Sequence, residues 1–229
     1  MDAYEFSWEL YKAQTEDFSE DLQFYQNFSK DCVTLDIFSG YGRICNFLSK
    51  NNLFISAVEK NKNFASHIAL PKDNIYITDI LEFQTKKKFE RIIAGYNSFC
   101  LLTEDNDIFK FFSILKSLLS SNGKISLNYF HPEFWKDSIN QEFFFNGMTI
   151  NYISDYNLNL DRKDMALWID NYIVGNKKYT YDYKVKVYKD INEINKYLKK
   201  FGLKILDVVH NFNNSNTSEL GWQDYIIGH

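Results

Sequence analysis

Between residues 32 and 130, short apolar runs alternate with segments of helical periodicity, and this alternation constrains the fold more than any other feature of the chain. Short runs that are apolar throughout are typical of strands buried on both faces of a sheet. Parallel strands need long connections, usually helices, and such crossovers are right-handed. The sequence therefore predicts βαβ units and a parallel sheet with helices on both faces. The expected strands span residues 32–38, 53–60, 74–80, 88–96 and 123–130, and the expected helices span 43–51, 63–70 and 107–121.

Two of these helices are expected to end at residues that oppose helix formation. Pro71 is predicted to terminate the helix over 63–70, and Asn122 with Gly123 the helix over 107–121.

The pattern changes after Pro132. From about residue 143 to residue 189 polar and apolar side chains alternate, with Gly147 and Gly175 between the segments. A period of two predicts antiparallel strands with one apolar face and one face in water.

The two ends of the chain carry further elements. In residues 4–29 large apolar side chains recur every three or four positions, which predicts an amphipathic helical arm broken near residues 15–19. Residues 191–202 are expected to form a helix with Gly202 just past its end, and residues 203–212 and 222–229 two closing strands.

Composition narrows the class of protein. Aromatic residues make up 18% of the chain, which supplies ample apolar area for a core and excludes wholesale disorder. The net charge is -4 and arginine occurs only as Arg43, Arg91 and Arg162, which argues against a nucleic acid or an anionic membrane as partner. Three scattered cysteines without a CxxC pair fit a reducing compartment. With no signal-peptide pattern and no apolar run of membrane-spanning length, we expect a cytoplasmic protein.

Together these segments predict a single α/β domain over residues 1–229. Its N-terminal arm would cover residues 1–30 and its β-rich insertion residues 138–190.

The most informative segment is a glycine turn between the first strand and the first helix after it. The strand ends near Asp36, and Gly40 and Gly42 follow. Glycines let backbone N–H groups approach a ligand closely, and the N-terminus of a helix favours a negative group. A dinucleotide fold would have a third glycine where this chain has Cys45, and a P-loop is excluded because no Gly-Lys-Ser/Thr follows.

Two further carboxylates follow the next two strands. Glu59 ends the second strand, where an acidic residue can accept both hydroxyls of a ribose, and Asp79 ends the third. Any one such acid is ordinarily a strand-end or helix-capping residue. Three in successive units, with Asp36, are expected to converge on the crevice in which open α/β sheets bind ligands.

On these residues the chain resembles the class I S-adenosylmethionine-dependent methyltransferases, specifically the small single-domain group that acts on small molecules. The first motif of that family, commonly LDLGCGTGR, is similar to residues 35–43, LDIFSGYGR, and residues 57–61, AVEKN, resemble its ribose-binding strand end. The family's later segments resemble residues 77–83, 88–102, 118–130 and 201–229, and its lid arm resembles residues 10–25. The resemblance implies a Rossmann-like fold, a seven-stranded mixed sheet whose last strand is antiparallel, and S-adenosylmethionine as cofactor with S-adenosylhomocysteine as product.

The resemblance also implies roles for individual residues. Asp36, with Ser39, Gly40 and Gly42 in the turn, would hold the methionine end, and Glu59 the ribose. The adenine would be bordered by Lys60 and Asn61 and bound by Asp79 and the backbone N–H of Ile80. Tyr96 and Asn97 would face the methyl donor, and Tyr11 in the arm would reach or cover the cofactor.

The chain departs from the family at Phe38, where the family's first glycine stands. Its Cβ must avoid the methionine moiety, so we expect Phe38 to turn away from the ligand. This variant turn leaves open a cofactor-binding subunit or sensor without turnover.

The expected function is methyl transfer to nitrogen or oxygen of a small-molecule acceptor. A sulfonium donor is already activated, so the protein mainly aligns the reactants and excludes water. An alcohol or phenol acceptor also needs a base, and His131, just after the fifth strand, is the candidate, although a loop histidine beside a proline equally fits a structural role. Glu133 and Trp135 are candidates for the acceptor pocket.

Other interpretations remain open. An NAD-dependent oxidoreductase is the second enzyme class, weakened by the incomplete glycine pattern. Catechol-type metal chemistry is disfavoured, because Asp105 and Asp107 fit a solvated helix N-terminus better than a metal site. An exposed edge in the β insertion could pair with a second copy, so a homodimer is a further possibility.

Overall fold

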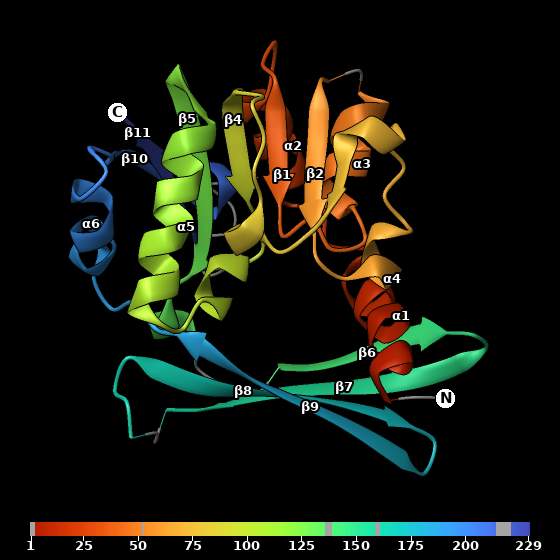
Figure 1. The fold of residues 1–229 in the computed structure, drawn as a ribbon. Coiled ribbons are helices and arrows are strands. Elements are labelled where there is room, and N and C mark those ends of the chain that lie inside the picture. Colours follow the sequence, from red (N-terminus) through yellow and green to blue (C-terminus); the bar gives the residue numbers. More distant parts are fainter. Residues whose placement is uncertain (1–2, 52, 136–138, 159–160, 214–220) are drawn as a thin grey trace. The chain divides into compact units, whose positions relative to one another are not determined.

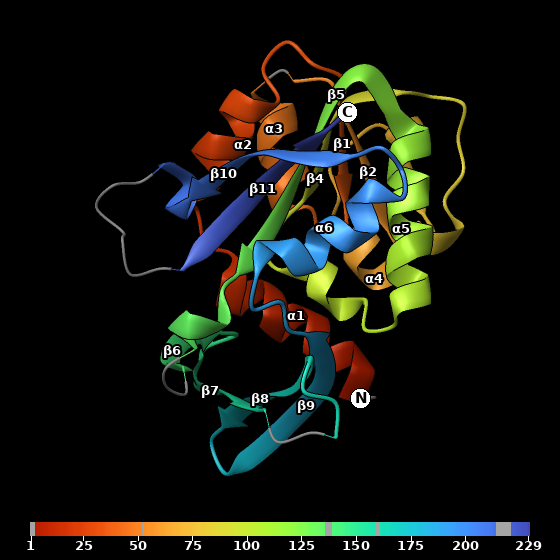
Figure 2. The same cartoon turned by 90° about the vertical axis from the view of Figure 1, so that its left-hand side faces the viewer.

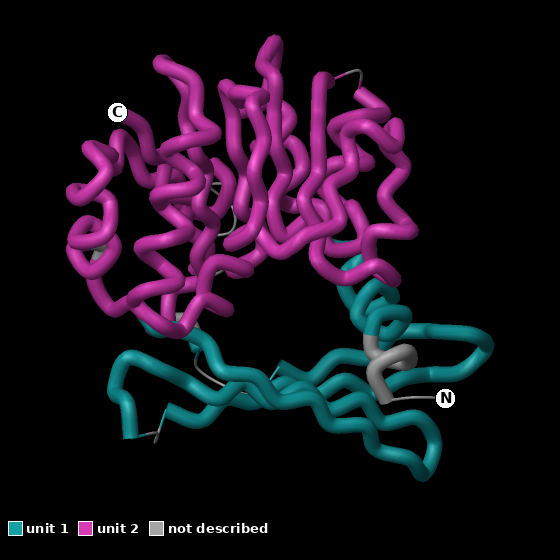
Figure 3. Tube along the Cα trace, in the orientation of Figure 1, with its two compact units in different colours: residues 1–18, 135–187 teal, residues 19–134, 188–229 magenta. Residues whose placement is uncertain are grey.

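The computed structural model describes residues 3–51, 53–135, 139–158, 161–213 and 221–229, and the chain forms two compact units (Figure 3). Unit 1 comprises residues 1–18 and 135–187, and unit 2 comprises residues 19–134 and 188–229. The predicted arm is therefore divided: its first helix lies in unit 1 and its second in unit 2.

Unit 2 is built on a seven-stranded sheet in the order β10-β11-β5-β4-β1-β2-β3 (Figure 1). Helices α2 and α3 lie on one face of this sheet and helices α5 and α6 on the other (Figure 2). The strands are β1 (Thr34–Ile37), β2 (Ile55–Glu59), β3 (Ile75–Ile77), β4 (Phe89–Ala94), β5 (Leu119–Phe130), β10 (Lys204–His210) and β11 (Trp222–Gly228). The helices are α2 (Leu22–Phe28), α3 (Arg43–Lys50), α4 (Lys62–Ala65), α5 (Asp105–Leu118) and α6 (Ile191–Lys199), with 3₁₀ helices η1 (Lys72–Asn74), η2 (Ile80–Glu82), η3 (Ser98–Leu101), η4 (Pro132–Phe134) and η5 (Asn211–Asn213).

The central strands form because their side chains are buried on both faces. Every residue of β1 and of β2 is buried, as expected for parallel strands covered by helices. Strand β1 pairs in parallel with β2 and with β4, and β11 is antiparallel to both β5 and β10. The predicted seven-stranded mixed sheet, with an antiparallel last strand, is confirmed.

Two predicted helix ends are wrong, and tertiary contacts explain both. Helix α5 ends at Leu118, and the chain is already extended at Leu119, which pairs with Phe89 of β4. Helix α4 ends at Ala65 rather than near Pro71. The Asn46 side chain hydrogen-bonds to the backbone of residues 67 and 69, which holds that segment in a non-helical path.

Unit 1 contains a four-stranded antiparallel sheet in the order β6-β7-β8-β9 and helix α1 (Ala3–Thr15). The strands are β6 (Ile139–Phe145), β7 (Met148–Asn157), β8 (Met165–Val174) and β9 (Lys177–Lys186). This confirms the antiparallel strands predicted from the period-two alternation, with Gly147 and Gly175 at positive φ in the turns. Leu10 of α1 is buried against Ile150, Tyr152 and Tyr172 of the sheet.

Within the described part of the chain, none of the helices combines the length and the apolar character needed to cross a membrane.

Candidate functional site

The turn that follows β1 adopts a backbone path that favours glycine. Gly40 and Gly42 have φ of 57° and 89°, in the left-handed region that residues with a Cβ rarely adopt. A Cβ on Gly42 would lie 2.8 Å from Nδ2 of Asn46, whereas a Cβ on Gly40 would meet nothing within 4 Å. Glycine is therefore favoured at position 42 by its conformation, and a Cβ there would also displace the Asn46 amide.

Phe38 shares this unusual conformation although it is not a glycine. Its φ is 55°, a strain of about 1–3 kcal/mol for a bulky residue. The Phe38 ring stacks on Phe111 of α5 with centroids 5.9 Å apart, and Phe111 is completely buried. This aromatic contact offsets part of the strain and holds the ring against α5.

Asp36 lies inside the sheet just before this turn. Its side chain is 2% exposed, and its Oδ2 has no hydrogen-bond partner among the described residues. Burial raises the pKa of Asp36 to about 7, although the positive charge of Arg43 and nearby hydrogen bonds lower it. The site thus contains a buried carboxyl group that titrates near neutrality and has one unused oxygen.

Glu59 connects the end of β2 to the glycine turn. Its Oε2 accepts a hydrogen bond of 2.8 Å from the Gly40 N–H, and its Oε1 accepts one of 2.7 Å from the Asn61 N–H. A carboxylate oxygen has two lone pairs, so both oxygens can accept a further donor. Glu59 therefore stabilises the turn and can still accept hydroxyl groups.

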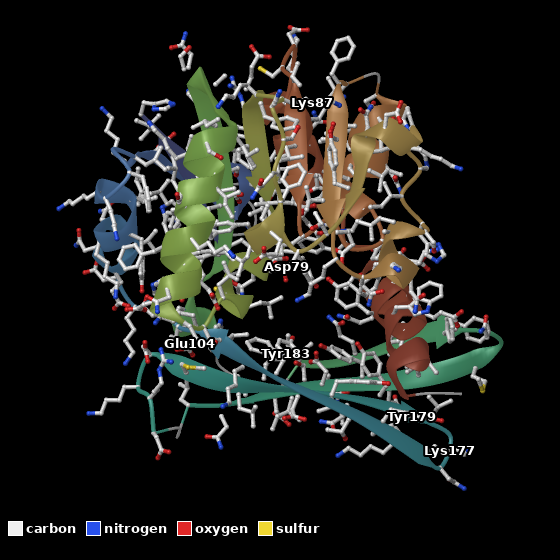
Figure 4. All side chains as sticks on the ribbon, viewed as in Figure 1. Asp79, Lys87, Glu104, Lys177, Tyr179 and Tyr183 are labelled. Carbon is white, nitrogen blue, oxygen red and sulfur yellow. The ribbon has the colours of Figure 1, made fainter. Side chains whose placement is uncertain are left out.

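Asp79 lies after β3, at the edge of the sheet where the parallel strands end (Figure 4). Its Oδ1 accepts the Leu81 N–H at 2.9 Å, so it caps η2, and its Oδ2 lies 3.8 Å from Lys60 Nζ. Ile80 is 3% exposed, and its backbone N–H takes part in none of the hydrogen bonds between described residues. The predicted adenine-binding residues are thus adjacent, and Asp79 also has the structural role considered for it.

Figure 4 shows the two ends of the parallel strands: Asp79 and Glu104, the N-cap of α5, lie at one end, and Lys87 lies at the other.

The register of β1, β2 and β3 shows how the carboxylates of Asp36, Glu59 and Asp79 are spaced. Asp36 pairs with Ala57 of β2, and Glu59, two residues further on, pairs with Ile77 of β3. The structure therefore brings Asp36, Glu59 and Asp79 to one edge of three neighbouring strands.

The turn after β4 depends on a polar network that sequence reasoning missed. Tyr96 and Asn97 both have positive φ. The Asn97 N–H donates to Oδ1 of Asn128, and Nδ2 of Asn128 donates to Oδ2 of Asp224 at 2.9 Å. Asp224 is fully buried and also accepts hydrogen bonds from Tyr25 and Ser126. The signal in the sequence that could have revealed this network is the pair of polar residues, Ser126 and Asn128, within the buried second half of β5.

The Tyr96 ring is held from two sides. It stacks on Trp222 of β11 with centroids 5.5 Å apart, and the Arg43 guanidinium lies 5.6 Å from its centre. Arg43 in turn forms two hydrogen bonds of 2.6 Å with the buried Asp21. The paired guanidinium is therefore fixed in place beside the ring.

His131 follows β5 in unit 2, whereas Tyr11 belongs to α1 in unit 1. The Nδ1 atom of His131 accepts the Glu133 N–H at 3.3 Å, so the neutral ring carries its proton on Nε2. Its imidazole is largely buried beside Tyr129, which it meets edge-on at 6.1 Å. Across the described residues, no group of three or more His, Cys, Asp or Glu side chains is arranged to hold a metal ion.

No protein-family model matches the sequence, and no curated protein matches it. Solved structures do match. One is an S-adenosylmethionine-dependent methyltransferase from Clostridium acetobutylicum, 17% identical, with 98% of each chain covered and a TM-score of 0.74. Another is a sugar N-methyltransferase from Streptoalloteichus, 12% identical over 97% of this chain and 92% of the other, with a TM-score of 0.76.

An amino pentose methyltransferase from Micromonospora echinaspora, solved with S-adenosylmethionine bound, is 13% identical over 99% of this chain and 97% of the other, with a TM-score of 0.74. The chain has the fold of the class I S-adenosylmethionine-dependent methyltransferases. The fold predicted from the resemblance is thus confirmed, and in a methyltransferase fold the edge that carries Asp36, Glu59 and Asp79 is the candidate cofactor site.

Proposed function

We propose that the chain transfers a methyl group from S-adenosylmethionine to a nitrogen or oxygen atom of a small-molecule acceptor. The observation that carries this proposal is the set of three carboxylates, Asp36, Glu59 and Asp79, at the ends of adjacent strands beside a glycine turn. The neighbours in the same fold support it, since two of them are methyltransferases for sugar substrates by their names.

The residues present fit this cofactor. The unused Oδ2 of Asp36 is a buried acceptor beside the turn, suited to the ammonium group of the methionine end through the turn or a water. Both oxygens of Glu59 have a lone pair left for the two ribose hydroxyls. Beside them, Asp79 offers an acceptor and Ile80 an unused backbone donor, which together match the edge of an adenine ring.

The remaining predicted residues would complete the site. Lys60 and Asn61 would border the adenine, and Ser39, Gly40 and Gly42 would shape the turn around the methionine end. Tyr96 and Asn97 would lie near the reactive methyl group, where the Asn128 and Asp224 network holds their backbone in position. Tyr11 would close over the cofactor.

The methyl group is supplied as a sulfonium, which is already activated, so the chain's residues need only orient the acceptor and exclude water. A hydroxyl acceptor needs a base in addition, and we propose His131 for that role. Because Nδ1 of His131 accepts a backbone N–H, and the neutral ring then carries its proton on Nε2, proton uptake would require the imidazole to give up that contact.

Calorimetric titration tests the cofactor directly. The purified protein is titrated with S-adenosylmethionine, S-adenosylhomocysteine and NAD. Micromolar binding of the first two without an NAD signal supports the proposal, and binding of NAD alone would replace it with redox chemistry.

A methyl-transfer screen then separates an enzyme from a sensor. Small amines and hydroxyl compounds are incubated with S-adenosylmethionine, and production of S-adenosylhomocysteine is measured. Cofactor binding without turnover on any acceptor would favour a non-catalytic binding subunit.

A further inference from the structure

One face of the sheet in unit 1 carries a carboxylate among aromatic side chains. Side chains alternate between the two faces of a strand, so residues at register partners and at every second position share a face. Ser154 of β7 pairs with Asp170 of β8, and Tyr156 pairs with Trp168. These four residues therefore lie on the same face, which continues into Tyr152 and the buried cluster with Leu10.

Hydrogen bonds orient the Asp170 carboxylate through one of its oxygens. Its Oδ1 accepts the Tyr152 hydroxyl at 2.7 Å and the Ser154 hydroxyl at 2.6 Å. The Ser154 Oγ itself accepts the indole N–H of Trp168. The side chain of Tyr183 in β9 also hydrogen-bonds to this carboxylate.

The charge on Asp170 is not balanced within the part of the chain that the structure describes. No described lysine, arginine or histidine forms an ion pair with it. Tyr183 of β9 supplies no positive charge either, because burial and the charge of Asp170 raise the pKa of its hydroxyl and keep it neutral (Figure 4). A bound cation would give this carboxylate a partner of opposite charge and a charge-assisted hydrogen bond.

The aromatic rings beside this carboxylate suit a cation. Trp135 meets Trp168 edge-on with centroids 5.1 Å apart and lies 5.3 Å from Tyr156, and Tyr156 lies 6.0 Å from Trp168. The faces of such rings attract ammonium groups, most strongly where water is excluded. Trp135 is 5% exposed, and Tyr156 and Trp168 are half-buried, so water is partly excluded from this cluster.

We propose that Asp170 and the rings of Trp135, Tyr156 and Trp168 form a site that binds a protonated amine of the acceptor molecule. This inference rests on the proposed methyl transfer and narrows its acceptor to amine-bearing small molecules. It concerns recognition of the acceptor, because the methyl transfer itself needs a nucleophile with a free electron pair.

The test uses cyclohexylamine, which is protonated at neutral pH, and cyclohexanol as an uncharged probe of similar shape. Binding to the full chain is followed by tryptophan fluorescence, since Trp135 and Trp168 belong to the site. We expect saturable binding of cyclohexylamine and binding of cyclohexanol weaker by about tenfold, the effect of roughly 1.4 kcal/mol. Equal affinity for the two probes would overturn the inference.

Two aspartate variants identify the group responsible. Asp170→Asn removes the charge and should weaken cyclohexylamine binding about tenfold. Asp155→Asn is the matched control, because Asp155 is exposed and follows Ser154, so it faces the opposite side of the sheet. Unchanged amine affinity in Asp170→Asn would overturn the inference.

A third variant guards against loss of folding. If thermal denaturation shows that Asp170→Asn is unfolded, Trp168→Leu keeps the charge and removes one ring, and it should weaken amine binding several-fold. Undiminished amine binding in a folded Trp168→Leu variant would contradict the site.

Calorimetry with S-adenosylmethionine separates failure of this inference from failure of the proposed function. The Asp170→Asn variant should bind the cofactor like the parent. If parent and variants all fail to bind it, the proposed function falls. If cofactor binds but amine binding does not depend on Asp170, only the present inference falls.

Discussion

Asp36→Asn is the substitution whose effect can be worked out most fully from the structure. Burial raises the pKa of Asp36 from 3.8 to about 7 in the folded protein. A folded-state pKa above the unfolded one means that this group favours folding at low pH. That contribution is lost as the pH rises from about 4 through about 7.

The size of the loss follows from the shift. A difference of about 3 pKa units corresponds to roughly 4 kcal/mol between the two limits of pH. With pKa values of 3.8 in the unfolded chain and about 7 in the folded protein, the stability that Asp36 contributes falls by about 3 kcal/mol between pH 5 and pH 8. Asparagine does not titrate, so the stability of Asp36→Asn relative to the parent should rise by about 3 kcal/mol over this range.

Urea denaturation at pH 5 and pH 8, followed by tryptophan fluorescence, measures this difference. Asp224, whose pKa is raised to about 6 by burial, titrates in both proteins and cancels. Asp73→Asn, at an exposed aspartate of η1, is the control and should show no such change. A stability difference between Asp36→Asn and the parent that stays constant within about 1 kcal/mol from pH 5 to pH 8 would refute the reasoning.

The same variant also reports on the ligand. If the ionised carboxylate of Asp36 attracts the ammonium end of S-adenosylmethionine, the parent should bind it more tightly at pH 8 than at pH 6. The affinity of Asp36→Asn should be lower and independent of this titration. Equal affinities of the two proteins at both pH values would remove Asp36 from the proposed cofactor site.

The other predictions concern the turn, the nucleoside and the base. Gly42→Ala should lose more stability in urea denaturation than Gly40→Ala, by about 1 kcal/mol or more, because only the first meets a neighbouring side chain; equal losses would contradict the close approach. Asp79→Asn should weaken S-adenosylmethionine binding by about tenfold or more in calorimetry and leave the melting temperature nearly unchanged. Glu59→Ala should lower both the affinity for S-adenosylmethionine and the melting temperature, because Glu59 also accepts two backbone N–H groups. An effect on neither quantity would refute the placement of Glu59. His131→Ala should keep cofactor affinity and lose turnover on hydroxyl acceptors; full turnover would exclude it as the base.

The sequence was sufficient to predict the sheet and the edge that carries the carboxylates. Whether a strand is apolar throughout or alternates is a local property, and it identified β1 and β2 as buried strands and β7 to β9 as antiparallel ones. Because parallel strands end at one edge of a sheet, Asp36 and Glu59 could be placed together without knowledge of any contact.

Element ends were less predictable, since they depend on distant partners. Helix α4 stops early because Asn46, in another helix, binds the chain after it. Strand β5 begins earlier than predicted because Leu119 pairs with Phe89 of the neighbouring strand β4. Neither partner is visible in the local periodicity from which the ends were predicted.

Local sequence therefore determined which segments are strands and helices, and which strand ends carry acids, because burial and turn chemistry act on neighbouring residues. Only the tertiary structure decided which polar groups share a partner. Tyr25 and Asp224 are hydrogen-bonded across 199 positions, and Ser154 and Asp170 meet because β7 and β8 pair in one register. Hydrogen bonds of this kind depend on register and packing to within an ångström, and residue type and spacing along the chain do not specify either.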